Sequence, residues 1–531
     1  MADLPELRIG IDVGGTNTDA VALDAGGRVI AKAKRPTTPD VTEGLRAALD
    51  AVLGELGEGA RIGRVMLGTT HATNAILERR GLGRVAVVRL GAPATTSVPP
   101  LSDWPGDLRE AVSAGEAILP GGHYVDGREI SPPDLDAVRR FLDGTRADGA
   151  RADAVAVTSV FSPASDEHER LVAELVAAEY GLPVSMSHEI GSLGLLEREN
   201  ATVLNAALYG VAAHVTDALV TALDERGLGV PGRRAEPYLA QNDGTLMTVE
   251  HAARLPVSTI GSGPANSLRG AAFLSGVADA IVVDVGGTST DLGVLSGGFP
   301  RESAAAVEIG GVLTNFRMPD ILAIALGGGT KVRRHGVGPD SVGYRIVREA
   351  LVFGGGTATM TDAAVAAGRG PREAPGWRDR LAAALGDMSE EIADTLERAV
   401  MIADEMVIDA VDRMSLGKTD RPLVAVGGGA FLLPDRVPGV SRVIRPEHAE
   451  VANAVGAAIA LASGRVDTIL PAGDSRSEAI ERAKEEAVGR AVAAGADPSG
   501  VEIVDLLEVP LSYLSEPAVR VHVKAAGPLA R

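Results

Sequence analysis

Cysteine, aromatic side chains and positive charge are all scarce in this chain of 531 residues. The absence of cysteine excludes disulfides, thiolate metal sites and cysteine nucleophiles. Aromatic residues make up only 3%, so we expect cores built from Ala, Val, Leu and Ile. A formal net charge of −20 argues against a nucleic-acid backbone or an anionic membrane as a partner.

Long hydrophobic runs are also missing. The most apolar segment, residues 451–463, is too short to span a bilayer. The first ten residues show no basic region followed by an apolar stretch, so no signal peptide is expected. We therefore predict a cytoplasmic protein without membrane segments, and its length suggests roughly two to four domains.

One ten-residue pattern occurs twice, as GIDVGGTNTD at 10–19 and VVDVGGTSTD at 282–291. Each copy has a β-branched run, an Asp, a Gly-Gly pair, hydroxyl side chains and a second Asp. Residues 11–24 and 283–296 share eight identities in fourteen positions. The repeat predicts two related α/β halves whose loops face each other across a cleft.

The two loops have the chemistry of a clamp for a metal-bound polyphosphate. Glycine lets backbone N–H groups approach an anion closely, and carboxylates hold a hard cation. We expect Asp12 and Asp284 to hold Mg²⁺ or its water ligands. The predicted ATP or phosphate contacts are Gly14, Gly15, Thr16, Asn17, Gly286, Gly287, Thr288 and Ser289. For Asp19 and Asp291, a functional role and a simple turn or cap bond remain equally open.

Other glycine-rich segments follow. Gly327, Gly328 and Gly329, and later Gly427, Gly428 and Gly429, are expected to line the nucleotide, the second set within a strand, turn and helix at 422–434. The LGKT string at 416–419 is not expected to be a P-loop, because it follows a helix. His188 and Glu189 suit either ligand contacts or loop capping.

The periodicity predicts strands at 8–13, 18–24 and 28–34, a helix at 41–56, and then alternating strands and helices that continue one parallel sheet. A Pro/Gly-rich passage at about 92–135 suits an insertion that lines a cleft or a surface excursion. A long apolar helix is expected near 193–224. We place domains at 1–190, 191–465 and 466–531, the last a small α+β appendage.

The segment GTTHATN at 68–74 follows a parallel strand and opens a helix, so its amides and hydroxyls are expected at the cleft. Helix capping by Thr69 or Thr70 is the alternative. QNDG at 241–244 and TNF at 314–316 are weaker candidates on the same argument. The predicted substrate contacts are Thr69, Thr70, His71, Asn74, Asn242 and Asp243.

These motifs, together with SHEIGSLGLLERENATVLNAAL and TIGSGPANSLRGAAFL, resemble the hydantoinase A/5-oxoprolinase family over residues 8–465. The resemblance implies an α/β fold with duplicated actin-like (ribonuclease H-like) ATPase domains, a cleft between them and the C-terminal α+β appendage. It also implies a Mg²⁺- and ATP-dependent enzyme that opens a cyclic amide such as a hydantoin, oxoproline or lactam by phosphorylating its carbonyl oxygen. The catalytic residues would be Asp12, Thr16, Asp284, Thr70 and Asn74.

The resemblance has two departures, because many relatives carry an aromatic residue at Asn17 and an aliphatic one at His71. Nothing here resembles the family's B-type unit, so we expect a separate B-type subunit in a hetero-oligomer; a homodimer stays open. The alternatives are a small-molecule kinase, an ATP-dependent carboxylase subunit and a non-enzymatic ATP-driven switch.

Overall fold

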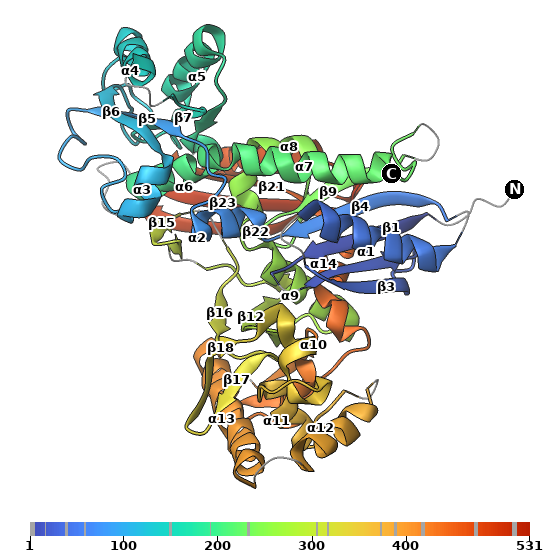
Figure 1. The fold of residues 1–531 in the computed structure, drawn as a ribbon. Helices are drawn as coiled ribbons and strands as arrows, with labels where there is room; N and C mark the ends of the chain where they lie inside the picture. The colour runs from blue at the N-terminus through green and yellow to red at the C-terminus, as the bar shows by residue number, and fades with distance from the viewer. Residues whose placement is uncertain are drawn as a thin grey trace, which may run out of the picture.

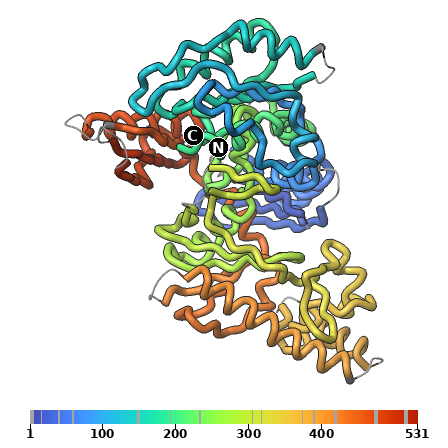
Figure 2. Tube along the Cα trace, turned by 90° about the vertical axis from the view of Figure 1, so that its left-hand side faces the viewer, coloured from blue at the N-terminus to red at the C-terminus, as the bar shows by residue number. Residues whose placement is uncertain are grey.

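The computed structural model describes residues 6–15, 17–37, 41–57, 60–147, 151–191, 193–230, 234–303, 306–315, 318–371, 374–386, 390–415, 420–471, 476–511 and 518–530. Figure 1 shows a central body built on one large sheet, a smaller lobe at its upper left and a second large lobe below. Figure 2, turned by 90°, shows these three bodies one above another, with the C-terminal strands projecting to one side.

The central sheet has nine strands in the order β22-β23-β21-β10-β9-β4-β1-β2-β3. Its N-terminal part comprises β1 (Leu7–Val13), β2 (Asn17–Leu23), β3 (Val29–Pro36), α1 (Val41–Leu56) and β4 (Ile62–Thr69). β1 pairs antiparallel with β2 and parallel with β4. The predicted three-stranded start and the helix after it are confirmed, because alternating apolar residues bury one face of each element.

The C-terminal region extends this same sheet. The strands involved are β9 (Glu236–Ala240), β10 (Leu246–Thr248), β21 (Ala462–Pro471), β22 (Glu502–Leu511) and β23 (Ala518–Gly527). The helix α15 (Arg476–Ala493) packs on β21 and β23. The predicted α+β content of the tail is present. The sheet, however, runs across residues 190 and 465, and the domain boundaries expected there stay a prediction.

The upper-left lobe contains a separate four-stranded parallel sheet, ordered β6-β5-β7-β8. Its elements are β5 (Val85–Ala92), α3 (Gly106–Val112), β6 (Ser113–Pro120), α4 (Leu135–Ala147), β7 (Ala154–Ser159), α5 (Glu167–Tyr180) and β8 (Val184–Met186). The expectation that these strands continue the first sheet is wrong. Both edges of β4 are already taken by β1 and β9, so β5 cannot pair beside the strand that precedes it.

The passage at 92–135 is neither a plain surface excursion nor only a connector. It supplies β6, and Trp104 is buried at 6% exposure with its Nε1 donating to Asn200 Oδ1 at 2.7 Å. The passage therefore contributes to the core beneath the lobe. The predicted long helix near 193–224 is two helices, α6 (Leu195–Ala207) and α7 (Tyr209–Asp224).

The lower lobe repeats the N-terminal arrangement. Its main sheet contains β11 (Ala280–Val285), β12 (Thr290–Ser296), β13 (Phe299–Pro300), β16 (Ile321–Ile324), β19 (Arg421–Val426) and β20 (Val440–Ile444). β11 pairs antiparallel with β12 and parallel with β19, as β1 does with β2 and β4. The duplicated topology predicted from the two loops is confirmed.

The rest of the lower lobe is smaller strands and helices. They are β17 (Thr330–Arg333), β18 (Gly336–Ser341), α10 (Ile346–Glu349), α11 (Met360–Ala366), α12 (Gly376–Gly386) and α13 (Glu390–Met414). The hairpin of β14 (Val307–Ile309) and β15 (Val312–Thr314) lies instead against α2 (His71–Glu78) and α6, next to the upper-left lobe (Figure 1). After β19 the glycine turn leads into a 3₁₀ turn at Ala430–Leu432, not the expected α-helix. The LGKT segment at 416–419 lies outside the described residues.

Two helices connect the central body to the lower lobe, α9 (Ser262–Ser275) and α14 (Ala452–Ile459). Glycine lets the two helices cross closely. A Cβ at Gly456 would overlap the Asn266 carbonyl, and one at Gly270 would overlap the Ala452 carbonyl. α14 also lies against β1, where Gly10 leaves room for the Ala454 carbonyl. These contacts place both helices directly beside residues 12–15, the first of the two Asp-Gly-Gly loops; the second is residues 284–287.

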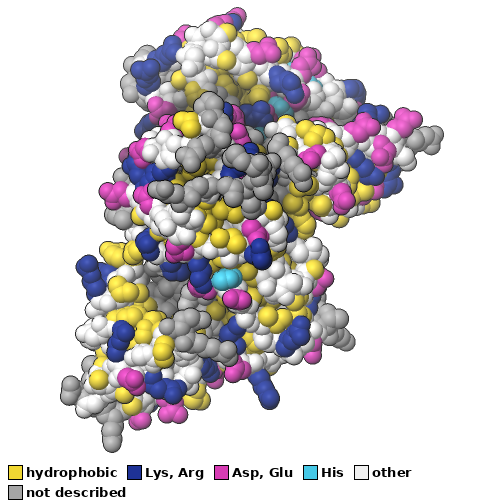
Figure 3. Space-filling view, turned by 90° about the vertical axis from the view of Figure 1, so that its right-hand side faces the viewer, with side chains coloured by type: hydrophobic (Ala, Val, Ile, Leu, Met, Phe, Trp, Pro, Cys, Tyr) yellow, Lys and Arg dark blue, Asp and Glu magenta, His cyan; other side chains and the backbone are white. Residues whose placement is uncertain are grey.

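The cores consist mainly of Ala, Val, Leu and Ile, as the scarcity of aromatics predicts. Acidic and basic side chains are interspersed over the face shown in Figure 3. Within the described part of the chain, no single helix is long and apolar enough to cross a membrane. α6 and α7 reach that length only together, with a bend of 48° between them.

Candidate active site

Both Asp-Gly-Gly loops close with the same backbone turn. The N–H of Gly14 donates to the Asn17 carbonyl at 3.1 Å, and the N–H of Gly286 donates to the Ser289 carbonyl at 2.9 Å. These two amides are therefore already used within the loops. Among the described residues, no acceptor faces the N–H groups of Gly15, Gly287 and Thr288, which remain available for an anion. Thr16 lies outside the described residues.

Asp12 lies at the end of β1 and is held by both connecting helices. Its Oδ1 accepts from Asn266 Nδ2 of α9 at 3.4 Å, and its Oδ2 accepts from Asn453 Nδ2 of α14 at 2.9 Å. Burial, followed by the neighbouring carboxylate of Asp19, raises the pKa of Asp12 to about 6. The Asp284 carboxylate acts in the same direction, so the two loop aspartates feel each other's charge.

Asp284 occupies the equivalent place at the end of β11. The Ser267 hydroxyl of α9 donates to its Oδ2, while burial raises the pKa of Asp284. Gly427 packs against the same carboxylate with φ at +86°, and a Cβ there would overlap Asp284 Oδ1. Only glycine fits both the backbone conformation and the space at this position.

The second aspartates of the two loops differ in their partners. Asp19 lies opposite Lys34 in the β2–β3 register, and Lys34 Nζ donates to its Oδ1 at 2.5 Å. Asp291 lies opposite Ala323 in the corresponding β12–β16 register. Burial, then the charge of Asp284, raises the pKa of Asp291 to about 7. The site therefore combines a charge-paired aspartate with one that takes up a proton near neutral pH.

The two later glycine segments pack against the second loop. Gly328 and Gly329 donate their N–H groups to the carbonyls of Gly286 and Gly287 at 3.0 and 2.7 Å. In the other segment, the Gly429 N–H donates to the Val285 carbonyl at 2.8 Å. Both segments thus hold the second loop through backbone hydrogen bonds. Direct nucleotide contacts by Gly327–Gly329 and Gly427–Gly429 stay a prediction, for which Gly428 is exposed.

Thr70 and Asn74 lie beside the first loop. The Thr70 hydroxyl donates to the Val13 carbonyl at 3.3 Å, and Asn74 Nδ2 donates to Thr70 Oγ1 at 3.4 Å. The first turn of α2 (His71–Glu78) is thereby brought to the loop edge, where the sequence argument expected it. Their contact with substrate or phosphate stays a prediction.

Thr69 and His71 are turned away from this edge. Thr69 is buried, its Oγ1 accepts from the His71 N–H at 3.2 Å, and it also bonds to the His71 ring. The ring borders a small apolar cavity of about 10 Å³ against α7. Burial, with a smaller effect of His214, lowers the pKa of His71 to about 4, so the imidazole is neutral. Thr69 thus accepts the first N–H of α2, in line with the capping alternative, whereas the side chain of Thr70, the N-cap residue, makes no cap bond.

Asn242 and Asp243 lie elsewhere. Asp243 is buried between Arg465 and Lys524, at 2.5 and 2.8 Å. Burial alone would raise its pKa, but the two cations hold it well below the usual range. Asn242 lines a cavity of about 390 Å³ that also contains His188 and Glu189. None of its lining residues belongs to either Asp-Gly-Gly loop.

Four contributors to the site escaped the sequence argument: Lys34, Asn266, Ser267 and Asn453. Asn266 and Ser267 belong to the GSGPANSL segment, whose position at the start of a helix gave no hint that it reaches both loops. Asn453 follows α13 by 39 positions in an Ala-rich run and carried no signal of its own. Lys34 was detectable only through the strand register.

The residues fit a magnesium ion in one respect. Two buried carboxylates with raised pKa values offer the hard oxygen donors that Mg²⁺ takes, usually one or two carboxylates beside phosphates and water. Within the described residues, no group of three or more His, Cys, Asp or Glu side chains could hold a metal by itself. Asp12 and Asp284 would therefore bind the ion together with phosphate oxygens.

Comparison with known proteins defines the class. The model of the hydantoinase/oxoprolinase N-terminal region matches residues 8–180, and the hydantoinase/oxoprolinase model matches residues 198–466. The chain belongs to the hydantoinase/oxoprolinase family, as its motifs predicted.

Individual relatives are more distant. Caprolactamase subunit alpha of Pseudomonas jessenii is 29% identical over 476 residues, covering 80% of this chain and 66% of the relative. The acetophenone carboxylase gamma subunit of Aromatoleum aromaticum is 29% identical over 454 residues, covering 76% and 60%. This chain thus spans about two thirds of their length or less.

Solved structures confirm the α/β two-lobed fold. The ATP-dependent caprolactamase from Pseudomonas jessenii superimposes with a TM-score of 0.76 at 21% identity, covering 99% of this chain and 88% of that one. Nucleotide-free acetone carboxylase gives a TM-score of 0.69 at 18% identity, with the same coverage. At these identities the likeness concerns the fold alone.

Proposed function

We propose that this chain is a subunit of an ATP-dependent amidohydrolase that opens a cyclic amide of the hydantoin, oxoproline or lactam type. The observation that carries the proposal is that adjacent residues of α9, Asn266 and Ser267, hydrogen-bond to Asp12 of one loop and Asp284 of the other. Thr70 and Asn74 lie at the edge of the first loop. Family membership and the resemblance to a caprolactamase subunit support it.

Different groups of this chain would bind the phosphates, the metal ion and the amide. The free N–H groups of Gly15, Gly287 and Thr288 would bind phosphate oxygens of ATP. Asp12 and Asp284 would hold Mg²⁺, which neutralises charge on the phosphates when it is bound. Thr70 and Asn74 would orient the amide carbonyl toward the nucleotide. The raised pKa values of the two aspartates fit this assignment, since a bound cation would favour their charged forms.

Phosphorylation solves a chemical problem of the substrate. Amide resonance deactivates the carbonyl of an unstrained ring toward water. Transfer of the terminal phosphoryl group of ATP to the carbonyl oxygen breaks the bond to ADP and turns that oxygen into a good leaving group. Water then adds at the carbon, the C–N bond breaks with protonation of the nitrogen, and a second water releases phosphate. The products are the open amino acid, ADP and phosphate.

A carboxylase subunit is the second candidate, and one observation favours it. The acetophenone carboxylase gamma subunit is as similar in sequence as the caprolactamase subunit, at 29% identity for both. The same phosphate site would then activate a ketone or bicarbonate oxygen.

We also propose a separate partner chain of the B type in a hetero-oligomer. The relatives are named as subunits, alpha in the lactamase and gamma in the carboxylase. Isolation of a tagged chain from its native host should therefore recover a second, unrelated polypeptide. Recovery of this chain alone under gentle conditions would contradict the partner.

The first experiment is ADP release with Mg²⁺ and ATP in the presence of hydantoin, oxoproline or a simple lactam, with and without the candidate partner. Ring-dependent ADP release with ring opening is expected. ADP release that instead requires a ketone and bicarbonate would favour the carboxylase. A stable phosphorylated product would point to a kinase, and slow turnover indifferent to every added compound would point to a switch.

A further inference from the structure

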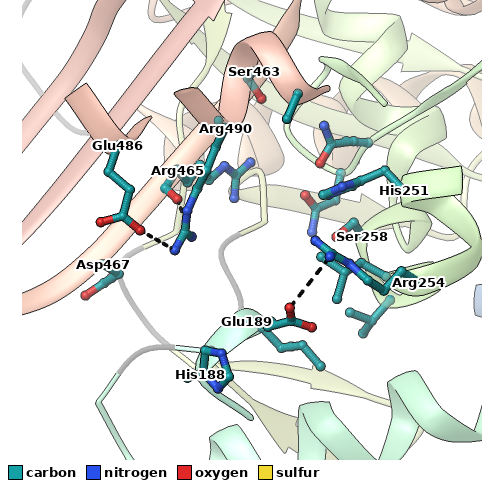
Figure 4. Close-up of a pocket in the computed structure, with 18 of the residues that line it drawn as sticks. His188, Glu189, His251, Arg254, Ser258, Ser463, Arg465, Asp467, Glu486 and Arg490 are labelled. Atoms are coloured by element: carbon teal, nitrogen blue, oxygen red, sulfur yellow. Dashed lines mark hydrogen bonds and ion pairs between the residues drawn. The ribbon is translucent and has the colours of Figure 1, made fainter. Parts of the chain in front are cut away.

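The cavity of about 390 Å³ that Asn242 lines lies away from the two Asp-Gly-Gly loops (Figure 4). It forms where the 3₁₀ turns Ser187–Glu189 and Pro256–Thr259 meet α8 (Val249–Arg254), β21 and α15. Its volume falls in the range of small-molecule sites, roughly 300–1,000 Å³. The proposed function assigns no role to it.

Sequence segments without a place in the active site converge here. His188 and Glu189 come from SHEIGSLG, Gln241 and Asn242 from QNDG, and Asn315 from the TNF segment. They are up to 127 positions apart in the chain, between His188 and Asn315. Polar side chains brought together from three distant segments around one hollow suit a binding site better than a chance surface depression.

Several hydrogen-bond donors in the cavity are uncommitted. The Arg254 side chain is 59% exposed, and its ion pair with Glu189 is loose at 3.8 Å. His522 is 3% exposed, but its ring nitrogens face the carboxylates of Asp467 and Asp505 at 3.6 and 3.8 Å, so it is not counted among these donors. The Asn242 amide is 4% exposed and makes no side-chain hydrogen bond among the described residues.

Most of the acidic groups are, in contrast, already paired. Arg520 donates twice to Asp467, at 2.9 and 2.8 Å, and Arg490 donates to Glu486 at 2.7 Å. Figure 4 shows Arg254 and His251 on one side of the hollow and Arg465 and Arg490 on the other. The hydrogen-bonding groups that remain without partners in the cavity are therefore mainly donors, which suits an anion.

The local field agrees with this geometry. Burial lowers the pKa of His251 to about 4, and the charges of Arg254 and Arg490 add to the effect. The imidazole is thus neutral between two cations and offers one further N–H donor.

We infer that this cavity binds a small carboxylate, held by Arg254 with His251 and Asn242 as further donors. A guanidinium forms two parallel bonds to a carboxylate, and a single negative charge suits the cavity because Glu189 and Glu486 would repel a dianionic phosphate. A carboxylate is also what opening of a cyclic amide releases; that link, unlike the binding itself, rests on the proposed function.

Calorimetric titration without nucleotide tests the inference, with the monoanion butyrate, 6-aminohexanoate and inorganic phosphate as probes. Saturable binding of a carboxylate is expected, weakened roughly tenfold or more in Arg254→Gln, since a charge-assisted bond is lost. Arg254 is largely exposed, so the variant should fold. Asn242→Ser should weaken binding in the same direction. Arg46→Gln, which changes an exposed ion pair outside the cavity, is the matched control and should bind as wild type.

Three results would overturn the assignment: no saturable binding of either carboxylate, tighter binding of phosphate, or affinity that survives Arg254→Gln but is lost in Asp12→Asn. Binding of butyrate without 6-aminohexanoate would keep the carboxylate site and remove its link to ring-opened products. Because no ATP is present, carboxylate binding by a chain that turns over no cyclic amide would count against the proposed function alone.

Discussion

Asp12 and Asp284 are the residues on which the phosphate clamp depends. We expect Asp12→Asn and Asp284→Asn each to lower ATP turnover roughly a hundredfold or more, because the uncharged amide no longer holds Mg²⁺. The near-isosteric change keeps the shape of the side chain, and the amide oxygen still accepts one of the two bonds at Asp12 and the Ser267 bond at Asp284. The circular dichroism spectrum should therefore stay close to wild type.

Asp50→Asn is the matched control, because Asp50 pairs with Arg226 on the surface. Its turnover should be unchanged. Wild-type turnover in both loop variants would show that the paired aspartates do not hold the nucleotide's metal ion.

The raised pKa of Asp291 predicts that the stability of the folded protein falls as the pH rises. This pKa is about 7 in the folded protein, against 3.8 for an unperturbed aspartate, so the folded state retains a proton that the unfolded chain has lost between these pH values. Its contribution to stability is therefore fully present below the lower value and is lost as the pH rises through about 7. Asp291→Asn removes this loss.

Urea unfolding at several pH values measures the difference in unfolding free energy between Asp291→Asn and wild type. The variant should gain on the order of 4 kcal/mol relative to wild type at pH 8 and much less at pH 4. A difference between variant and wild type that does not change with pH would contradict the assigned protonation.

At the scale of elements, the crossing of α9 and α14 positions the site. The two helices carry Asn266 and Asn453, which hold Asp12 from both sides, and their approach requires glycine at 456. A methyl group there would overlap the Asn266 carbonyl and push the helices apart.

We expect Gly456→Ala to lower the free energy of unfolding by about 1–3 kcal/mol and to reduce ATP turnover as well. Gly489→Ala in α15 is the matched control: its Cβ would meet nothing within 4 Å, so the change should be neutral or stabilising by up to about 1 kcal/mol. Equal effects of the two substitutions in denaturant unfolding would show that the crossing tolerates the extra volume.

At the scale of the whole molecule, the upper-left lobe is attached through a buried ionic cluster. Arg89 of β5 donates to both oxygens of Glu199 in α6, at 2.7 and 2.6 Å, and neither side chain is more than 1% exposed. The next residue, Asn200, donates to the Leu313 carbonyl at 2.9 Å. The ERENA string of the family motif is therefore structural in this chain.

Glu199→Ala should lower the free energy of unfolding by about 3–5 kcal/mol, because it leaves the Arg89 charge buried without a partner. Glu225→Ala, which removes an exposed partner of Arg46, should cost no more than about 1 kcal/mol. Similar midpoints of thermal unfolding for the two variants would contradict the role of the cluster.

Sequence periodicity was sufficient for many individual elements, including β1 to β4 and α1, because alternation and helical spacing follow directly from which side chains are buried. It failed for sheet membership. Whether β5 joins the first sheet depends on which edges of β4 remain free, and β9 takes the last one from more than 160 positions away.

The sequence by itself determined the two Asp-Gly-Gly loops, the duplicated hairpins and the family, since each is written in local residues whose geometry needs no distant partner. Only the tertiary structure decided that Asn266 and Asn453 hold Asp12, that Asp291 faces Ala323 where Asp19 faces Lys34, and that three motif segments surround a second cavity. Those relations arise from strand register and helix crossing, which long-range packing fixes and local sequence does not.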